Sequence, residues 1–376
     1  EVLAYYDHGG SHYFNWKKDW HASGDDLGIE YLTDDLTERA VRFIRECNDS
    51  GQPFFLYLPH FAVHSPREAK EKDIAYFSNK ENRGWNGHSS ADYAGVLRGL
   101  DNSVGKIVDT IDELGISENT LIIFMSDNGG INRADVTNNA PLRDGKASKY
   151  EGGIRVPLIV RWPGKAMAGT VCNVPVDCND VFPTILSAVQ QGSDLASLKL
   201  DGESILPLFT DPKNSSGSYT RDAFFWHAPF GGLNKNGSYS PAHSAMRKGN
   251  YKLLFDHQGY LELYDLSKDL SEEHNLVKTM PEKAKQMFAE LDSWLDATVA
   301  ERYLPQPNTL YDSVKNAESA APPFRDLRHE LLGAKPLPVS MESVSKPVLK
   351  NVTKIKPAKK APTAQPEKAH AIRTWA

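Results

Sequence analysis

The sequence lacks the features that most quickly assign a chain to a structural class. Only 3 cysteines occur in 376 residues, which excludes a disulfide-rich scaffold. No apolar run approaches the length needed to cross a bilayer, so we expect no transmembrane helix. The net charge of −6 leaves no basic excess, and we expect no nucleic-acid partner. No internal repeat is visible, which argues against a repeat architecture.

The cysteines and the first residues carry two further expectations. Cys47, Cys172 and Cys178 do not have the spacing of metal ligands, and we expect free structural thiols, with a Cys172–Cys178 disulfide as the alternative. Residue 1 is Glu rather than Met, and no signal peptide is recognisable after it. Because Glu1 to Asp7 read like the interior of a domain, we expect a fragment of a longer protein.

Length and composition predict a globular protein of two domains and a tail. Hydrophobic residues make up 40% and charged residues 24%, as in ordinary folded proteins. A chain of 376 residues exceeds one typical domain. We predict a larger domain over 1–213 and a smaller one over 214–305, because residues 211–219 are rich in Pro, Asn, Ser and Gly. The remainder, 306–376, is predicted to be a linker and a disordered tail rich in Lys and Pro.

Hydrophobic periodicity predicts an α/β first domain and an α+β second domain. Apolar residues recur at helical spacing in four segments, 31–43, 92–114, 180–189 and 281–300. Three short apolar runs are typical of buried strands, 54–58, 121–125 and 156–160. Because helices and strands alternate, we predict a parallel sheet with helices on its faces. Between 223 and 264, short alternating runs predict a small antiparallel sheet that the last helix covers.

A strand end carries the candidate metal ligands. The run Leu121–Met125 is followed by Ser126-Asp127-Asn128-Gly129-Gly130. In α/β proteins, ligands bind beyond the carboxyl ends of strands. The Asp127 carboxylate and the Asn128 amide carbonyl are oxygen ligands of the kind that Ca²⁺ or Mg²⁺ takes. The alternative is a plain turn, because Asp-Asn-Gly is a favoured turn sequence.

Lys146 and His64 are the candidate catalytic residues. Lys146 follows Gly145 and precedes a Gly-Gly pair that lets backbone pass close to a site. A lysine near a metal can neutralise an oxyanion of bound sulfate or phosphate; the alternative is a solvated loop lysine. His64 comes shortly after the predicted strand 54–58 and can act as an acid or base near neutral pH. His60, in the same loop, is interpreted as merely polar.

Two more histidines are candidates for substrate binding. His227 opens the second domain, and His12 lies in a Gly-Gly-Ser-His-Tyr segment near the first residue. A structural histidine is the alternative for His227, and a plain turn is the alternative for the segment of His12. Glu151 and Arg155 are expected to fix their loop through an ion pair rather than to contact substrate.

Taken together, these motifs resemble the sulfatase family. The resemblance extends from residue 1 to about residue 300 and rests on six stretches, Tyr31–Thr37, Pro53–Pro66, Asp127–Gly129, Gly145–Pro157, Met246–Leu254 and Glu262–Leu266. It implies an alkaline-phosphatase-like α/β sheet sandwiched by helices, with a small C-terminal α+β domain made of an antiparallel sheet and a helix.

The resemblance also implies a chemistry. Sulfatases hydrolyse sulfate monoesters with a formylglycine nucleophile, made from Cys or Ser, and with Ca²⁺ in preference to Mg²⁺. By this likeness Asp127 and Asn128 would bind Ca²⁺. Lys146 and His64 would contact the sulfate, and His64 or a neighbour would protonate the leaving alcohol. The substrate would be a sulfated small molecule or glycan, and the protein would be periplasmic or secreted. The sequence predicts neither the alcohol nor the oligomeric state.

The sequence departs from the family pattern in one respect. The modified residue of sulfatases lies in a Cys/Ser-x-Pro/Ala-x-Arg motif, and the segments after Cys47, Cys172 and Cys178 do not fit it. We expect the formylglycine in a segment upstream of this chain, and the chain alone to be inactive and poorly stable. The alternatives are a non-catalytic sulfatase-like protein that binds sulfated glycans, and a phosphodiesterase or phosphonate hydrolase of the same superfamily.

Overall fold

The computed structural model describes residues 13–14, 27–81, 84–133, 136–189, 197–230, 232–233, 239–240, 242–305 and 325–335, all of them within the compact unit Glu1–Leu337. The part of the chain up to residue 213 contains the helices α1 (Leu32–Asp49), α2 (Glu71–Ser78), α3 (Ala91–Glu113), α4 (Glu151–Ile154), α5 (Val181–Val189) and α6 (Leu206–Thr210). Its strands are β1 (Ile122–Met125) and β2 (Leu158–Arg161), and its 3₁₀ turns are η2 (Ser117–Asn119) and η3 (Cys178–Asp180).

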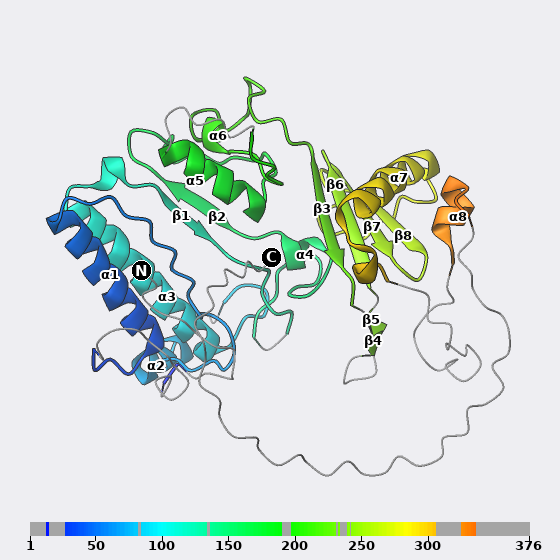
Figure 1. The fold of residues 1–376 in the computed structure, drawn as a ribbon. Helices are drawn as coiled ribbons and strands as arrows, with labels where there is room; N and C mark the ends of the chain where they lie inside the picture. Colours follow the sequence, from blue (N-terminus) through cyan, green and yellow to red (C-terminus); the bar gives the residue numbers. More distant parts are fainter. Residues whose placement is uncertain are drawn as a thin grey trace, which may run out of the picture. The chain divides into compact units, whose positions relative to one another are not determined.

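The part after residue 213 contains a sheet and a covering helix. Its elements are β3 (Ala223–Ala228), β4 (Gly232–Leu233), β5 (Tyr239–Ser240), β6 (His243–Lys248), β7 (Tyr251–Asp256), β8 (Tyr260–Asp265), α7 (Pro281–Thr298), η5 (Glu301–Tyr303) and α8 (Leu327–Leu332). Figure 1 shows β1 and β2 running between α1 and α3 on one side and α5 and α6 on the other. The mixture of helices and sheets confirms the predicted fold class.

Helices α1 and α3 pack closely because their contact surface is built from small and mutually bonded side chains. Gly99 of α3 leaves room for the ring of Tyr31, which precedes α1; a Cβ at Gly99 would lie 3.4 Å from that ring. The hydroxyls of Thr37 and Ser103 lie 2.6 Å apart. Because Thr37 donates its one proton to the carbonyl oxygen of Thr33, it accepts from Ser103, so the buried polar groups satisfy each other. The periodic apolar pattern of α3 predicted the helix correctly but not its buried face. Apolar Leu97 is 48% exposed, and most of the buried residues of the helix are small or polar, namely Gly95, Val96, Gly99, Ser103, Thr110 and Ile111.

The direction of β2 differs from the prediction. β1 and β2 pair antiparallel, with Ile122 opposite Arg161 and Met125 opposite Leu158. A parallel pair requires a crossover that carries the chain back along the sheet. Here the amide of Ser126 donates to the carbonyl oxygen of Pro157, 3.3 Å away, so β2 begins beside the end of β1. The intervening α4 is too short to act as a crossover helix.

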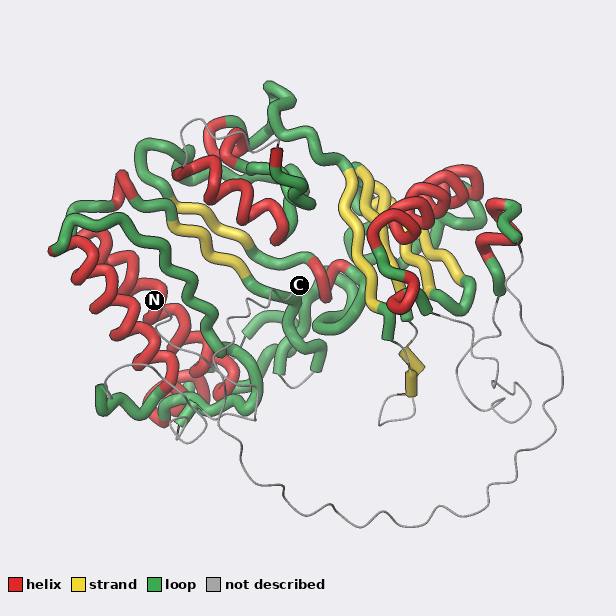
Figure 2. The backbone as a smooth tube through the Cα atoms, in the orientation of Figure 1, coloured by secondary structure: helices red, strands yellow, loops and turns green. Residues whose placement is uncertain are grey.

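The predicted strand at 54–58 is also wrong. Within the described part of the chain this segment has no strand partner, and it runs as the extended loop that Figure 2 draws in green. Its side chains alternate in exposure, and Phe55 and Tyr57 remain 69% and 77% exposed. The apolar run indicated burial on both faces, whereas one face is open, because strand pairing depends on a neighbouring segment that local sequence does not specify.

The small antiparallel sheet of the second half is confirmed. Its strands lie in the order β3-β6-β7-β8, and every neighbouring pair is antiparallel. Helix α7 covers it through the residues expected from its periodicity, and its buried core members are Ala284, Met287, Phe288, Leu291 and Leu295. Yellow strands beneath a red helix make this layer visible in Figure 2. Leu327 of α8 joins the same core, so part of the predicted linker is helical.

Two further predictions, on the cysteines and on membrane-spanning helices, can be compared with the structure. Cys47, Cys172 and Cys178 are free thiols, as expected. No helix in the described ranges is long and apolar enough to cross a membrane. The domain boundary near 213 stays a prediction, and most of the predicted tail lies outside the described residues.

Candidate active site

The two motifs singled out in the sequence meet through their backbones. The amide of Gly129 donates to the carbonyl oxygen of Gly153 at 2.9 Å, and the amide of Lys146 donates to the carbonyl oxygen of Gly130 at 3.0 Å. A Cβ at Gly129 would lie 1.7 Å from the carbonyl oxygen of Gly152, which no side chain allows. The glycines are therefore required by backbone packing, and they bring the loop of Lys146 against the end of β1.

The side chain of Asn139 stabilises this backbone junction through hydrogen bonds. Its side-chain oxygen accepts from the amide of Gly130 at 3.0 Å, and its side-chain NH₂ donates to the carbonyl oxygens of Gly130 and Asp144, each at 2.9 Å. One amide side chain thus binds both the strand end and the loop that carries Lys146. Sequence reasoning missed Asn139, because nothing local distinguishes it from the neighbouring Asn138.

Asp127 and Asn128 lie at the end of β1 with side chains that the fold barely uses. Asp127 is exposed, and one of its carboxylate oxygens accepts the amide of Asn128 at 2.9 Å. The Asn128 side chain makes no hydrogen bond within the described ranges. Both are oxygen donors suited to Ca²⁺, so they fit such an ion in kind. They do not complete its shell: no group of three or more His, Cys, Asp and Glu side chains among the described residues could hold a metal.

Lys146 presents an uncompensated positive charge. The residue is exposed, and its ammonium forms no ion pair with any residue that the structure describes. Its backbone is nevertheless fixed, because the amide binds Gly130 and the following turn closes through the amide of Ser148 and the carbonyl oxygen of Gly145 at 3.0 Å. A cation that is held by its backbone and free at its tip can bind an anion without first leaving another partner.

The ring of His64 has a defined tautomer. Its Nδ1 lies 2.7 Å from the carbonyl oxygen of Ser65, which can only accept, so Nδ1 carries the proton that it donates. The neutral ring therefore has its lone pair on Nε2, and the residue is exposed. The hydroxyl of buried Tyr13 lies 3.0 Å from the carbonyl oxygens of both Phe61 and His64 and fixes the turn. This arrangement leaves Nε2 available for proton transfer.

The structure joins some candidate residues and not others. Asp127, Asn128 and Lys146 belong to one hydrogen-bonded scaffold, while no hydrogen bond among the described residues connects that scaffold to His64. His12 lies outside the described residues, although the next residue, Tyr13, contacts the His64 turn. His60 is interior rather than merely polar: Ser103 Oγ lies 3.1 Å from its Nε2, and burial lowers its pKa to about 4.

His227 is held by the second sheet. Its Nε2 lies 2.9 Å from the carbonyl oxygen of Tyr303, to which it must donate. Its Nδ1 therefore accepts from the hydroxyl of Ser244 at 2.8 Å, and Ser244 in turn accepts from His257 Nε2 at 2.9 Å. Burial lowers the pKa of His257 to about 3, so the ring of His257 is neutral. Both nitrogens of His227 are occupied, which favours the structural alternative over substrate binding.

The expected ion pair of Glu151 with Arg155 is present, but Arg155 is not the nearest cation to the Glu151 carboxylate. The Arg155 guanidinium lies 3.8 Å from the Glu151 carboxylate, whereas the Lys252 ammonium lies 2.9 Å from it and is completely buried. Sequence reasoning missed Lys252, because its partner is 101 residues away in the chain.

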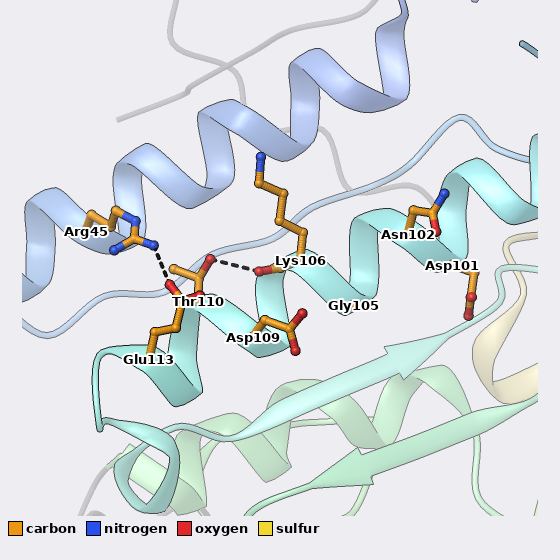
Figure 3. Close-up of a pocket in the computed structure, with 8 residues that line it drawn as sticks. All are labelled: Arg45, Asp101, Asn102, Gly105, Lys106, Asp109, Thr110 and Glu113. Carbon is orange, nitrogen blue, oxygen red and sulfur yellow. Dashed lines mark hydrogen bonds and ion pairs between the residues drawn. The ribbon is translucent and has the colours of Figure 1, made fainter.

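A cavity of about 400 Å³ lies elsewhere, along the outer face of α3. It is lined by Arg45, Asp101, Asn102, Gly105, Lys106, Asp109, Thr110 and Glu113. Figure 3 shows Arg45 of α1 paired with Glu113, at 2.8 Å, rather than pointing at an open site. None of the candidate site residues lines this cavity, and its polar lining is the solvated face of an amphipathic helix.

Comparison with known proteins adds family relationships to this geometry. Residues 4–191 match the family described as Sulfatase, and residues 144–301 match the family described as N-sulphoglucosamine sulphohydrolase, C-terminal. A protein named Sulfatase from Formosa agariphila is 34% identical over 288 residues, which cover 71% of this chain and 50% of that protein. Steryl-sulfatase of Rattus norvegicus is 30% identical over 301 residues, 72% of this chain and 48% of that enzyme. The chain thus spans about half the length of these relatives.

The fold itself is similar to solved structures. The crystal structure of Ps i-CgsB superposes with a TM-score of 0.65 and 28% identity, covering 84% of this chain and 70% of that one. The same protein in complex with k-i-k-neocarrahexaose gives a TM-score of 0.64.

Proposed function

The chain belongs to the sulfatase family, and on that premise we propose that its protein hydrolyses sulfate monoesters at the end of β1. The observation that carries the proposal is the backbone junction of Gly129 and Gly130 with the loop of Lys146. It sets on one scaffold an exposed carboxylate together with an ammonium and a carboxamide that bond no other side chain in the part of the protein that the structure describes. Such a set suits an oxyanion together with a hard cation.

Each side chain has a role in this proposal. The Lys146 ammonium binds a sulfate oxygen and neutralises charge as the ester bond breaks. His64, with Nδ1 donating to Ser65, is the candidate to protonate the leaving alcohol; it does so from the imidazolium form, in which Nε2 has taken up a second proton, and returns to the neutral ring. Asp127 and Asn128 would hold a Ca²⁺ ion, which would supply Lewis-acid polarisation and orientation of the sulfate. Mg²⁺, with its demand for a tight octahedral shell, fits two donors that do not complete a shell less well.

The nucleophile belongs to a different segment in this proposal. The 376 residues contain no Cys/Ser-x-Pro/Ala-x-Arg motif, so a formylglycine would be contributed by sequence outside them. We therefore expect no turnover from the 376-residue polypeptide alone. The site described here would supply the sulfate-binding half of the chemistry.

A sulfated sugar is the proposed substrate class. The support is the likeness to Ps i-CgsB, which was solved in complex with k-i-k-neocarrahexaose. We also propose a periplasmic or secreted location, as the family likeness implies. Fractionation of the native host would test that location directly.

The proposed activity is tested with protein expressed from the whole coding sequence in which these residues occur. Hydrolysis of 4-methylumbelliferyl sulfate, well above that of the matching phosphate and of a phosphonate monoester, is the expected result. Preferential hydrolysis of the phosphorus esters would favour the superfamily alternative. Binding of a sulfated glycan without any hydrolysis would favour the non-catalytic alternative.

A further inference from the structure

A buried ion cluster is bonded to the loop that carries Lys146. Lys252 of β7 is completely buried, and its ammonium lies 2.9 Å from the carboxylate of Glu151 and 2.9 Å from that of Glu272. Both carboxylates are buried as well. Two guanidinium groups lie further off, with Arg155 at 3.8 Å and Arg247 at 4.0 Å from the second oxygen of Glu151.

The cluster is attached to the site loop at both ends of that loop. The amide of Glu151 donates to a carboxylate oxygen of Glu272 at 2.6 Å. The guanidinium of Arg143 donates to the carbonyl oxygen of Glu272 at 2.7 Å. Arg143 and Glu151 flank the stretch that contains Lys146. Glu272 therefore accepts hydrogen bonds from both ends of that stretch. Glu151 is also followed immediately by the Gly152–Gly153 pair that packs against Gly129.

Stability alone is a poor explanation for such a cluster. Taking charges out of water costs several kcal/mol per ion, and well-packed apolar side chains of similar volume are often as stabilising. Burial raises the pKa of Glu272, while the Lys252 ammonium opposes that rise. What the ion pairs do provide is a fixed direction and distance, because a buried charge cannot leave its partner without a large penalty.

We propose that Lys252 is a positioning residue for the sulfate site. Its ammonium binds the carboxylates of Glu151 and Glu272. Through these ion pairs it fixes the position of the Gly152–Gly153 turn, which packs against Gly129. It fixes the Lys146 loop, which is bonded to Gly130, in the same way. The effect on sulfate rests on the proposed function; the effect on the backbone junction does not.

The test compares Lys252→Met with a matched control, Arg221→Met, in protein expressed from the whole coding sequence in which these residues occur. Arg221 pairs with Asp180 at 2.7 Å and with Asp177 at 2.9 Å, and Asp180 is completely buried. Both variants therefore leave a buried carboxylate without its cation, but only Lys252 is attached to the site loop. Both are examined by circular dichroism to establish that they are folded.

The first readout is hydrogen exchange at the amides of Gly129 and Lys146. Lys252→Met is expected to speed exchange at both amides by about tenfold or more, because the junction opens locally. Arg221→Met is expected to leave them close to the wild-type rates. Wild-type protection in folded Lys252→Met would overturn the proposal, and so would equal loss of protection in the two variants.

The second readout is the affinity for inorganic sulfate. A displacement of the Lys146 loop by about 1 Å is expected to weaken binding by up to about 10²-fold in Lys252→Met and to leave Arg221→Met unchanged. If the wild-type protein binds no sulfate, the proposed function fails, while the exchange comparison still decides the positioning role.

A second variant covers the case in which Lys252→Met does not fold. The triple variant Lys252→Met, Glu151→Gln and Glu272→Gln removes all three buried charges together, and leaves only the partly exposed guanidinium groups of Arg155 and Arg247 without their carboxylate. It is expected to fold and still to show fast exchange at Gly129 and Lys146. Wild-type protection in this neutral cluster would show that packing, not the ion pairs, sets the junction.

Discussion

Gly129 and Gly153 meet with their backbones in direct contact, the amide of the first donating to the carbonyl oxygen of the second at 2.9 Å. This bond joins the end of β1, which carries Asp127 and Asn128, to the loop that carries Lys146. The candidate site therefore depends on an approach that only glycine permits. Its consequences can be measured in stability, ion affinity and rate.

Replacing Gly129 with Ala is expected to destabilise the protein by about 1–3 kcal/mol or more, because the new methyl group would collide with the carbonyl oxygen of Gly152. Gly105→Ala is the matched control: it lies in α3, and a Cβ there meets nothing within 4 Å. That control should gain roughly 0.5–1 kcal/mol from helix propensity. Urea unfolding of both variants checks the contrast, and equal effects would contradict it.

Removing either proposed metal ligand is expected to weaken Ca²⁺ binding. Asp127→Ala and Asn128→Ala each delete an oxygen donor, and an affinity loss of about tenfold or more is expected in the whole protein. Asp109→Ala, an exposed acidic residue beside the cavity of α3, is the control. Calorimetric titration with Ca²⁺ measures all three. If Asp109→Ala lowered the Ca²⁺ affinity as much as Asp127→Ala, the ion would be binding to surface charge in general rather than at the proposed site.

His64→Ala is expected to slow the hydrolysis of sulfate esters by a factor that depends on the leaving group. A general acid contributes typically about 10²–10⁴-fold, and most when the departing alkoxide is basic. The loss should therefore be large for a sulfated sugar and small for a nitrophenyl-type ester. His274→Ala, on the exposed loop before α7, is the control. Equal losses for the two esters would contradict the proton-donor role of His64.

The buried histidines predict a pH dependence of stability. Burial lowers the pKa of His60 to about 4 and that of His257 to about 3, against an ordinary value near 6.5. Below pH 6.5 these two histidines are protonated in the unfolded chain but stay neutral in the folded chain. The free energy of unfolding should therefore fall as pH drops from 6.5 towards 4, on the order of 2 kcal/mol per histidine.

Denaturant unfolding at a series of pH values checks this dependence. His60→Gln keeps a polar partner for Ser103 but does not titrate, so its stability should fall less steeply over the same pH range. His257→Gln should act in the same direction. A slope as steep as that of the wild type in both variants would contradict the assignment of the slope to these rings.

The sequence predicted those parts of the fold whose signal is local. The apolar stripes of α3 and α7 are periodic over many residues, and both helices form where that period indicates. The four alternating runs of the second sheet likewise pair as expected. The direction of β2 and the unpaired run at 54–58 were mispredicted, because both depend on which segments lie side by side.

The candidate site divides in the same way. Asp127 and Lys146 were recognisable from residue type and flanking glycines, and their roles stay predictions. Asn139 and Lys252 were not recognisable. Nothing local distinguishes Asn139 from Asn138, and the carboxylate that Lys252 binds is 101 residues away in the chain. The tautomer of His64 also required the structure, since it follows from a single carbonyl oxygen, that of Ser65.

The most direct test of the sulfate site is calorimetric titration of the protein with inorganic sulfate in the presence of Ca²⁺. Wild-type protein should bind one sulfate saturably, and Lys146→Met should weaken the affinity by about tenfold or more. Lys165→Met, an exposed lysine that follows β2, should leave it unchanged. Equal affinities in wild type and Lys146→Met, or no saturable binding at all, would contradict the assignment of this site.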